Sequence, residues 1–315
     1  MDTLAVVFEQ PEVLSMKRLA LVDPGPADVV VQVEFTGIST GTERLLYTGK
    51  MPPFPGLGYP LVPGYETVGT VVEAGSASGR TVGEVVYVTG ARCYQEARGL
   101  FGGAARRLIV PGAKAWPVPA NLGERGALFA LAATAYHAIV ASDRGFLPDL
   151  VIGHGALGRL IARITMALDP AARPVVWETN PVRRQGTYPY LVIDPSEETR
   201  KDYRCIHEVA GANGIVDQLV PRLAPKGEIV LAGFYHEPVA FTFPMAFIKE
   251  ARIRIAAEWT DADLQETIAL VRDGRLSLDG LVTHRVAAAD AAAGYATAFT
   301  DPGCVKMVLD WRNAE

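Results

Sequence analysis

The stretch Val151-Ile152-Gly153-His154-Gly155-Ala156-Leu157-Gly158 decides the fold of this chain. It reads as a short apolar strand that enters G-x-G-x-x-G, and apolar residues at helical spacing follow as far as Ile164. A second apolar strand, Val175–Trp177, ends in Glu178, twenty residues beyond Gly158. Strand, glycines, helix, strand and carboxylate in this order are typical of a dinucleotide-binding unit in an α/β fold.

The glycines of this motif have separate tasks. Gly153 permits the tight turn, Gly155 lets the backbone approach a pyrophosphate, and Gly158 lets the helix pack closely on the strand. The free peptide N–H groups at the start of the helix then attract the negative diphosphate. We therefore predict a cofactor site made of Gly153, His154, Gly155, Ala156, Leu157, Gly158, Glu178, Gly211 and Gly233.

The acid at the end of the second strand favours one nicotinamide cofactor over the other. Glu178 can accept hydrogen bonds from both hydroxyls of the adenosine ribose, and it would repel a 2′-phosphate. This predicts NAD. Arg183 and Arg184 follow closely and could pair with such a phosphate, so NADP stays an alternative.

Composition places the chain among ordinary globular proteins with more than one domain. It has 315 residues, of which 49% are hydrophobic and 21% charged, and a formal net charge of −5 that does not favour nucleic acid. The start, Met1–Phe8, reads as a strand rather than a signal peptide, and no apolar run reaches the roughly 18 residues of a membrane span. The three scattered cysteines indicate no disulfide framework. We expect a cytoplasmic protein.

The pattern of elements changes twice along the chain. Residues 1–120 read as short strands separated by Gly and Pro, with a proline-rich loop at 51–60. An alanine-rich helix (126–142) precedes the glycine motif, after which short strands alternate with helices, as in a parallel sheet. Strand character returns near 283–286 and 305–309. We predict a doubly wound domain inserted into a β-domain, with boundaries at 1–122, 123–262 and 263–315.

Several strings carry a family resemblance across nearly the whole chain. They are Thr36–Glu43, Pro60–Glu66, Phe101–Ala105, Lys249-Glu250 and Asp301–Lys306. The chain thereby resembles the medium-chain dehydrogenase/reductase family, in which a GroES-like β-domain is split around a Rossmann domain. The resemblance implies an oxidoreductase that uses a nicotinamide cofactor and forms a homodimer through the sheets of its nucleotide domains.

Further strings resemble one subgroup of that family, which works in bacteriochlorophyll synthesis. They are Cys93–Gly103, Trp177–Pro181, Ile229–Tyr235, Ala256–Trp259 and Leu276–Gly280. The resemblance implies NAD-dependent oxidation of the 3-(1-hydroxyethyl) group of a bacteriochlorophyllide-type magnesium tetrapyrrole to 3-acetyl. Two alternatives stay open: a zinc-free quinone or enone reductase that uses NADPH, and a dinucleotide-binding protein without catalysis.

The chain departs from the zinc-binding pattern of the family. Aligned without gaps, Thr40 stands at the position of the first zinc cysteine and Tyr65 at that of the histidine, while residues 130–134 offer no third ligand. A tetrahedral zinc site needs three protein ligands, and only Glu66 remains. We therefore predict a zinc-free enzyme. An unconventional metal site at His137, His154 or a nearby carboxylate stays the alternative.

Hydroxyl groups are then the candidates for proton transfer. Thr42 matches the hydroxyl that relays the proton in the family, and Tyr65 lies near the missing zinc, with Thr40 and Glu66 as supports. Such a relay contributes roughly 10²–10⁴-fold as a general base. We propose that it suffices because positive charge that develops on the carbinol carbon spreads into the tetrapyrrole ring.

The segment 91–103 is the predicted substrate loop. It carries Arg92, Tyr94, Arg98 and Phe101 among glycines, close to where the family places its substrate. A flat macrocycle with a propionate calls for aromatic walls and for a cation that grips the carboxylate in two places.

Overall fold

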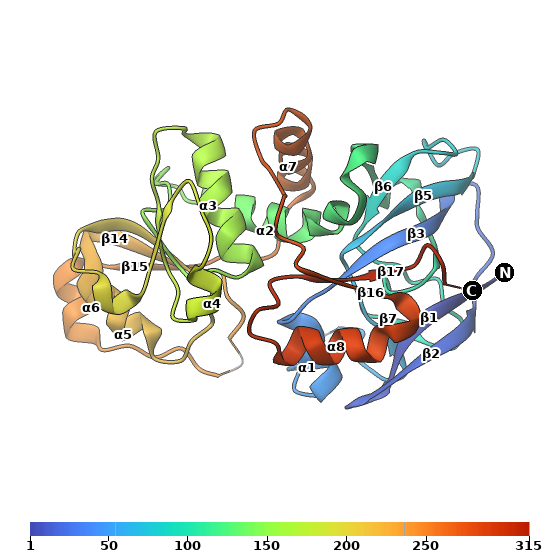
Figure 1. The fold of residues 1–315 in the computed structure, drawn as a ribbon, viewed down its shortest axis with the longest axis horizontal. Coiled ribbons are helices and arrows are strands. Elements are labelled where there is room, and N and C mark those ends of the chain that lie inside the picture. Colours follow the sequence, from blue (N-terminus) through green and yellow to red (C-terminus); the bar gives the residue numbers. More distant parts are fainter. Residues whose placement is uncertain (54, 236, 315) are drawn as a thin grey trace. The chain divides into compact units, whose positions relative to one another are not determined.

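The computed structural model describes residues 1–53, 55–235 and 237–314. It divides the chain into two compact units (Figure 1): Met1–Ala130 together with the residues from Asp279 onward, and Leu131–Leu278. The first unit therefore consists of both ends of the chain, and the second is inserted between them. This is the arrangement that the sequence predicts.

The first unit contains two sheets. One has the strand order β2-β1-β4-β7, with β1 (Asp2–Gln10), β2 (Val13–Ala20), β4 (Leu61–Val62) and β7 (Arg98–Gly99). The other has the order β16-β17-β3-β5-β6-β9, with β8 also paired to β3; its strands are β3 (Asp28–Ile38), β5 (Thr67–Ala74), β6 (Val85–Val88), β8 (Arg107–Pro111), β9 (Ala115–Pro117), β16 (His284–Ala287) and β17 (Met307–Asp310).

The C-terminal strands complete this β-domain. Strand β17 pairs antiparallel with β3, from Met307 opposite Ile38 to Asp310 opposite Phe35. In Figure 1 the red C-terminal strands accordingly lie beside the blue β3. The buried Trp311 then fixes the end of the chain, because its indole N–H donates to the Thr36 hydroxyl at 2.9 Å. Two α-helices, α1 (Thr42–Thr48) and α8 (Ala291–Thr300), and the 3-10 turns η1 (Gly112–Lys114), η2 (Ala120–Leu128) and η5 (Ala288–Asp290) complete the unit.

The second unit is built on a parallel six-stranded sheet of order β12-β11-β10-β13-β14-β15. The strands are β10 (Leu150–Ile152), β11 (Val175–Trp177), β12 (Leu191–Ile193), β13 (Tyr203–Glu208), β14 (Leu223–Leu231) and β15 (Arg252–Ile255). The helices are α2 (Phe129–Val140), α3 (Ala156–Leu168), α4 (Pro181–Arg184), α5 (Ile215–Leu219), α6 (Phe243–Lys249) and α7 (Asp261–Arg272), with the turns η3 (Pro195–Glu197) and η4 (Val220–Arg222). This strand order and the helical crossovers confirm the predicted doubly wound Rossmann sheet.

One side of this sheet has unusually short crossovers. The helix between β11 and β12, α4, has only four residues, and the turn η3 is the helical element between β12 and β13. Two tyrosines occupy this region instead: Tyr188 and Tyr190 stack at 5.6 Å, and both present their rings at nearly right angles to His154. Aromatic packing thus joins this segment to the glycine loop.

The second unit extends further along the chain than the predicted boundary at 262. Helix α7 belongs to it, because Asp263 bonds His137 at 2.9 Å and the Arg275 guanidinium donates to the carbonyl of Ala167 at 2.6 Å. A capping box between Thr260 and Asp263 stabilises the N-terminus of α7. Across the described parts of the chain, we find no helix with the length and apolar character needed to span a bilayer.

Candidate active site

The glycine loop has the geometry that a dinucleotide requires. Gly153 has φ +101°, and a Cβ on Gly158 would lie 1.8 Å from the carbonyl oxygen of Gly153. Helix α3 starts at Ala156 directly after Gly155, so its first peptide N–H groups point out of the loop. Side chains at the glycine positions would keep a diphosphate away from these N–H groups. The residues present therefore fit a bound diphosphate.

Glu178 lies at the end of β11 with its carboxylate anchored on this loop. Its Oε2 accepts the His154 N–H at 3.0 Å and its Oε1 accepts the Asn180 N–H at 2.7 Å. A carboxylate has about four acceptor positions, so two remain for ribose hydroxyls. Arg184 is already engaged, since its Nη1 donates to Asp194 at 2.7 Å and to the Glu178 carbonyl at 2.8 Å.

The His154 side chain turns away from the ligand side of the loop. It is fully buried, with Nδ1 2.8 Å from the carbonyl of Arg183 and Nε2 3.1 Å from the Tyr190 hydroxyl. A carbonyl only accepts, so Nδ1 carries the proton and Nε2 accepts from Tyr190. Burial lowers the pKa of His154 to about 4, which keeps the ring neutral. The ring therefore joins the loop to the segment after Glu178 and is not placed to contact a cofactor.

The two later glycines come together at the carboxyl ends of β13 and β14. A Cβ on Gly233 would lie 2.9 Å from the nitrogen of Gly211, so the two loops meet backbone to backbone. Ligands of doubly wound sheets bind at this edge. Both glycines stay predicted cofactor residues.

In the first unit, Tyr65 lies at the centre of a small hydroxyl cluster. Its Oη donates to the Ser39 hydroxyl at 2.8 Å and also interacts with the hydroxyl of Thr42, the first residue of α1. The ring of Phe101 packs edge-on against it, 5.4 Å between centroids. Burial first, and then the nearby Glu66 carboxylate, raise the pKa of Tyr65 above its ordinary value, so the phenol stays protonated at neutral pH.

Ser39, which the sequence analysis missed, occupies the place predicted for Thr40. Thr40 is exposed, whereas Ser39 is buried beside Tyr65. An alignment that starts from Gly37-Ile38 instead of from Gly41-Thr42 would have selected Ser39. Ser39 points inward and Thr40 outward in the turn that precedes α1.

Glu66 forms a buried ion pair. Both carboxylate oxygens lie 2.7 Å from Lys306 Nζ, which also donates to the Ile38 carbonyl at 3.1 Å. A Cβ on Gly37 would lie 2.0 Å from Glu66 Oε2, so only glycine leaves room for this carboxylate. With its oxygens engaged in this way, Glu66 is placed to support the cluster rather than to accept a substrate proton. Sequence analysis did not predict its partner Lys306.

A second buried acid, Glu43, lies one residue after Thr42. It accepts the Tyr295 hydroxyl at 2.6 Å and the Ser39 N–H at 3.2 Å. Burial raises its pKa to about 8, and the Glu66 carboxylate adds to this rise. The position and raised pKa of Glu43 are further features that no sequence pattern indicated.

The predicted substrate loop separates into exposed and buried residues. Arg92 and Arg98 are exposed, and Arg98 donates to the Leu57 carbonyl at 3.3 Å. Tyr94 is only 8% exposed and its hydroxyl donates to the Gly102 carbonyl at 2.6 Å, which corrects its predicted contact with a substrate. Tyr94 orders the loop from within. The substrate contacts of Phe101, Arg92 and Arg98 stay predictions.

The donor groups present do not fit a zinc site. Within residues 1–53, 55–235 and 237–314, no three His, Cys, Asp or Glu side chains lie close enough to hold one ion together. His137, an alternative ligand, pairs with Asp263. Tyr65 and Ser39 provide neutral hydroxyls where the family pattern has an imidazole and a thiolate.

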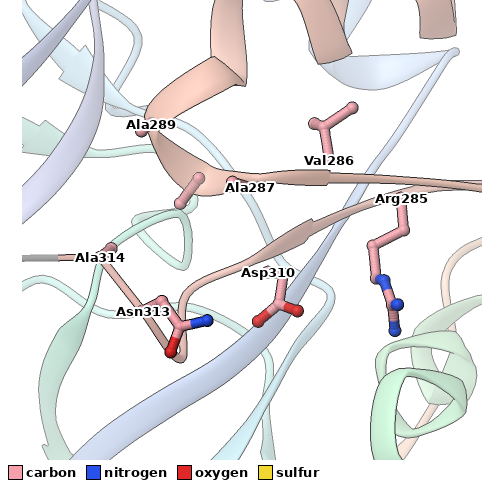
Figure 2. A pocket seen from close by; sticks show the side chains of 8 residues that line it. Arg285, Val286, Ala287, Ala289, Asp310, Asn313 and Ala314 are labelled. Carbon is pink, nitrogen blue, oxygen red and sulfur yellow. The ribbon is translucent and has the colours of Figure 1, made fainter.

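A small cavity lies elsewhere in the first unit, between β16, β17 and the C-terminal residues (Figure 2). Its volume is about 140 Å³, and Arg285, Asp310 and Asn313 provide its polar groups. Arg285 pairs with Glu124 at 3.2 Å and Asp310 with Arg312 at 2.7 Å. None of the predicted site residues lines it.

Comparison with known proteins adds a family and two close relatives. Residues 25–120 match the alcohol dehydrogenase GroES-like domain. A 2-desacetyl-2-hydroxyethyl bacteriochlorophyllide A dehydrogenase of Rhodobacter capsulatus is 52% identical, with 100% of both chains covered. A protein of the same name from Cereibacter sphaeroides is 53% identical, with 99% of both chains covered.

Solved structures share the fold at lower identity. A short chain alcohol dehydrogenase of Escherichia coli CFT073, solved with NADH, has a TM-score of 0.82 at 20% identity, covering 98% of this chain and 99% of that one. A dehydrogenase of Sinorhizobium meliloti 1021 bound to NADP has a TM-score of 0.82 at 22% identity, with the same coverage.

Proposed function

Because this chain belongs to the family of 2-desacetyl-2-hydroxyethyl bacteriochlorophyllide A dehydrogenases, we propose that it oxidises the 3-(1-hydroxyethyl) group of a bacteriochlorophyllide to 3-acetyl. The observation that carries the substrate is the 52–53% identity to these two enzymes over at least 99% of each chain. The glycine loop and the hydroxyl cluster supply the two chemical functions that this oxidation needs.

We propose NAD as the cofactor. Bound NAD would supply an acceptor for the hydride that leaves the carbinol carbon. Glu178 supports this choice, because its anchored carboxylate presents negative charge where a 2′-phosphate would have to lie. Arg184, which could have paired with that phosphate, is held by Asp194. The solved neighbours include both NADH and NADP complexes, so the choice depends on these residues.

The hydroxyl cluster would handle the proton of the carbinol. The Tyr65 phenol donates to Ser39, so the lone pairs of its oxygen are free to accept a hydrogen bond from the substrate hydroxyl. The transfer would be concerted: as the Tyr65 oxygen takes up the carbinol proton, its own phenolic proton passes to Ser39, and the Ser39 hydroxyl releases its proton to water. Thr42, whose hydroxyl also interacts with Tyr65, offers a second path for that proton. Phe101 would provide an aromatic wall for the macrocycle, with Arg92 or Arg98 facing its propionate. No metal ion takes part in this scheme.

The test is a pigment assay on chelator-treated protein. Purified protein is incubated with NAD and hydroxyethyl bacteriochlorophyllide, and the absorption of the pigment and of the NADH formed are both followed. We expect an equal yield of acetyl pigment and NADH, little turnover with NADP, and no loss after chelation. Loss of turnover that zinc restores would refute the zinc-free scheme, and preference for NADP would refute the role of Glu178.

We further propose that the protein is a homodimer. Strand β15 ends the sheet of the second unit, and the neighbouring α6 exposes Phe243 (65%), Phe247 (68%) and Ile248 (71%), while Ile255 on β15 is 79% exposed. Pairing β15 with a second copy would continue the sheet and cover these side chains. Light scattering should give a dimer, and Ile255→Lys should give a monomer; a monomeric wild type would exclude this proposal. A cytoplasmic location also stays a prediction.

A further inference from the structure

A buried carboxylate that the proposed function does not use joins two loops of the second unit. Glu208 ends β13 and is fully buried. Its Oε1 accepts the Ala210 N–H at 2.8 Å, and both oxygens accept the Gly211 N–H at 3.1 Å. Tyr235 also donates its hydroxyl to Oε2. Peptide N–H groups of residues 210–212 and the Tyr235 hydroxyl thus converge on one side chain.

The peptide carbonyl of the same residue holds the second loop. It accepts the N–H groups of Ala232 and Gly233 at 2.9 and 3.0 Å. Glu208 therefore connects residues 209–212 with residues 232–235, which we call the two cofactor loops because they carry Gly211 and Gly233. The glycines leave so little space that a Cβ on Gly233 would also come within 3.3 Å of Glu208 Oε2.

The protonation state of Glu208 matters for this connection. Only an ionised carboxylate accepts on both oxygens without offering a hydrogen of its own to the surrounding donors. Burial raises the pKa of Glu208 to about 7, against the opposing effect of the peptide N–H groups. Its neighbours in the sheet, Ile152 and Leu231, are apolar, and the titratable group in contact with it among the described residues is Tyr235.

We infer that Glu208 is a positioning residue whose ionised form fixes the two cofactor loops, so that dinucleotide affinity falls when this carboxylate takes up a proton. The inference rests on the proposed function only in that the second unit binds a nicotinamide dinucleotide. It adds a pH dependence of binding that belongs to the chain itself, independent of the substrate.

The test is NADH titration by fluorescence from pH 6 to 9 with the full-length protein. For the wild type we expect the Kd to rise as the pH falls below neutral, by up to roughly tenfold for each pH unit below the pKa, because only the ionised fraction is competent. Glu208→Gln should bind weakly at every pH and lose this dependence. Glu208→Asp keeps a carboxylate and should therefore recover part of the pH dependence of NADH binding. Tyr235→Phe should weaken binding by roughly two- to fivefold, since one hydrogen bond to the carboxylate is lost.

Glu228→Gln is the matched control. Glu228 is also a buried acid of this unit (1% exposed), but it lies at the other end of the strand pair, where it accepts from Ser142 at 3.0 Å. Its replacement should leave the pH profile of NADH binding unchanged. The pH dependence of stability distinguishes a purely structural role of Glu208 from a positioning role. Because the pKa of Glu208 is raised in the folded state, its ionisation makes the free energy of unfolding fall as the pH rises. The affinity for NADH should instead increase as the pH rises.

Different results would contradict the role of Glu208 and the binding of a nicotinamide dinucleotide. A wild type that binds NADH with the same Kd from pH 6 to 9, or Glu208→Gln with the wild-type profile, would overturn the inference and leave the proposed function intact. A wild type that binds neither NADH nor NADPH would overturn both. If Glu208→Gln does not fold, the profiles of the wild type and of Glu208→Asp still decide.

Discussion

The glycine loop of the second unit and the hydroxyl cluster of the first unit are built in opposite ways. The loop is one continuous stretch, Gly153–Gly158, whose ligand groups are peptide N–H groups and whose essential property is the absence of side chains. The cluster consists of side chains from segments far apart in the chain, namely Ser39, Thr42, Tyr65 and Phe101.

This difference determines how each region depends on its surroundings. The loop needs space, so it fails when any atom is added. The cluster needs its side chains to be held in place. The buried ion pair of Glu66 and Lys306 and the hydrogen bond between Glu43 and Tyr295 do this. The first region is therefore sensitive to steric changes, and the second to changes of charge and hydrogen bonding.

The largest effect should come from the charge that supports the cluster. Lys306→Met leaves Glu66 buried without its cation, which should lower the free energy of unfolding by about 3–5 kcal/mol. Denaturant unfolding measures this loss. The double variant Lys306→Met/Glu66→Leu should recover most of it, because no lone charge remains. Equal stability of the single variant and the wild type would show that the pair does not support the cluster.

A slightly smaller effect is expected from one methyl group in the loop. Gly158→Ala places a Cβ 1.8 Å from the Gly153 carbonyl, which should cost about 3 kcal/mol and abolish NADH binding. Gly155→Ala is the control within the same loop, since its Cβ would meet only the Arg183 side chain at 3.9 Å. It should fold with wild-type stability and lose affinity alone. If both variants lose stability equally, the distinction between packing and ligand approach is wrong.

The third prediction concerns turnover. Tyr65→Phe should lower kcat by at least roughly 10²-fold because the relay loses its central hydroxyl, while the KM for NAD stays unchanged. Thr42→Val should give a smaller loss of the same kind. Tyr47→Phe removes another tyrosine hydroxyl of the same unit, one that donates to the Glu12 carbonyl at 2.9 Å, and should leave kcat unchanged. Steady-state kinetics with the pigment as substrate measures these effects. An unaltered kcat for Tyr65→Phe would contradict the proposed proton relay.

The smallest effect should come from Glu43→Gln. Well below its ordinary pKa of 4.5 this acid is neutral both folded and unfolded, so at about pH 3 the replacement should change stability by less than about 1 kcal/mol. Between pH 5 and 8 the wild type should lose stability, since the pKa of Glu43 is raised to about 8 when folded and the unfolded chain therefore ionises first. Melting temperatures across this range should fall less steeply in the variant. Identical slopes would show that Glu43 is already ionised.

The sequence by itself determined the parts that depend on local order along the chain. The glycine spacing, the strand before it and Glu178 lie within thirty residues, and backbone sterics allow few arrangements for them. The β-domain completed by the C-terminus was likewise predictable, since strand patterns return near 283–286 and 305–309.

Only the tertiary structure decided which side chains meet. Ser39 rather than Thr40 bonds Tyr65, because the turn before α1 determines which residue points inward. Lys306 reaches Glu66 across 240 residues of sequence, and His154 bonds Tyr190, which lies 36 residues further along the chain. Such contacts depend on how separate strands are brought together, and no local pattern encodes them. Burial then alters the acids, because removal from water raises the pKa of Glu43 and of Glu208.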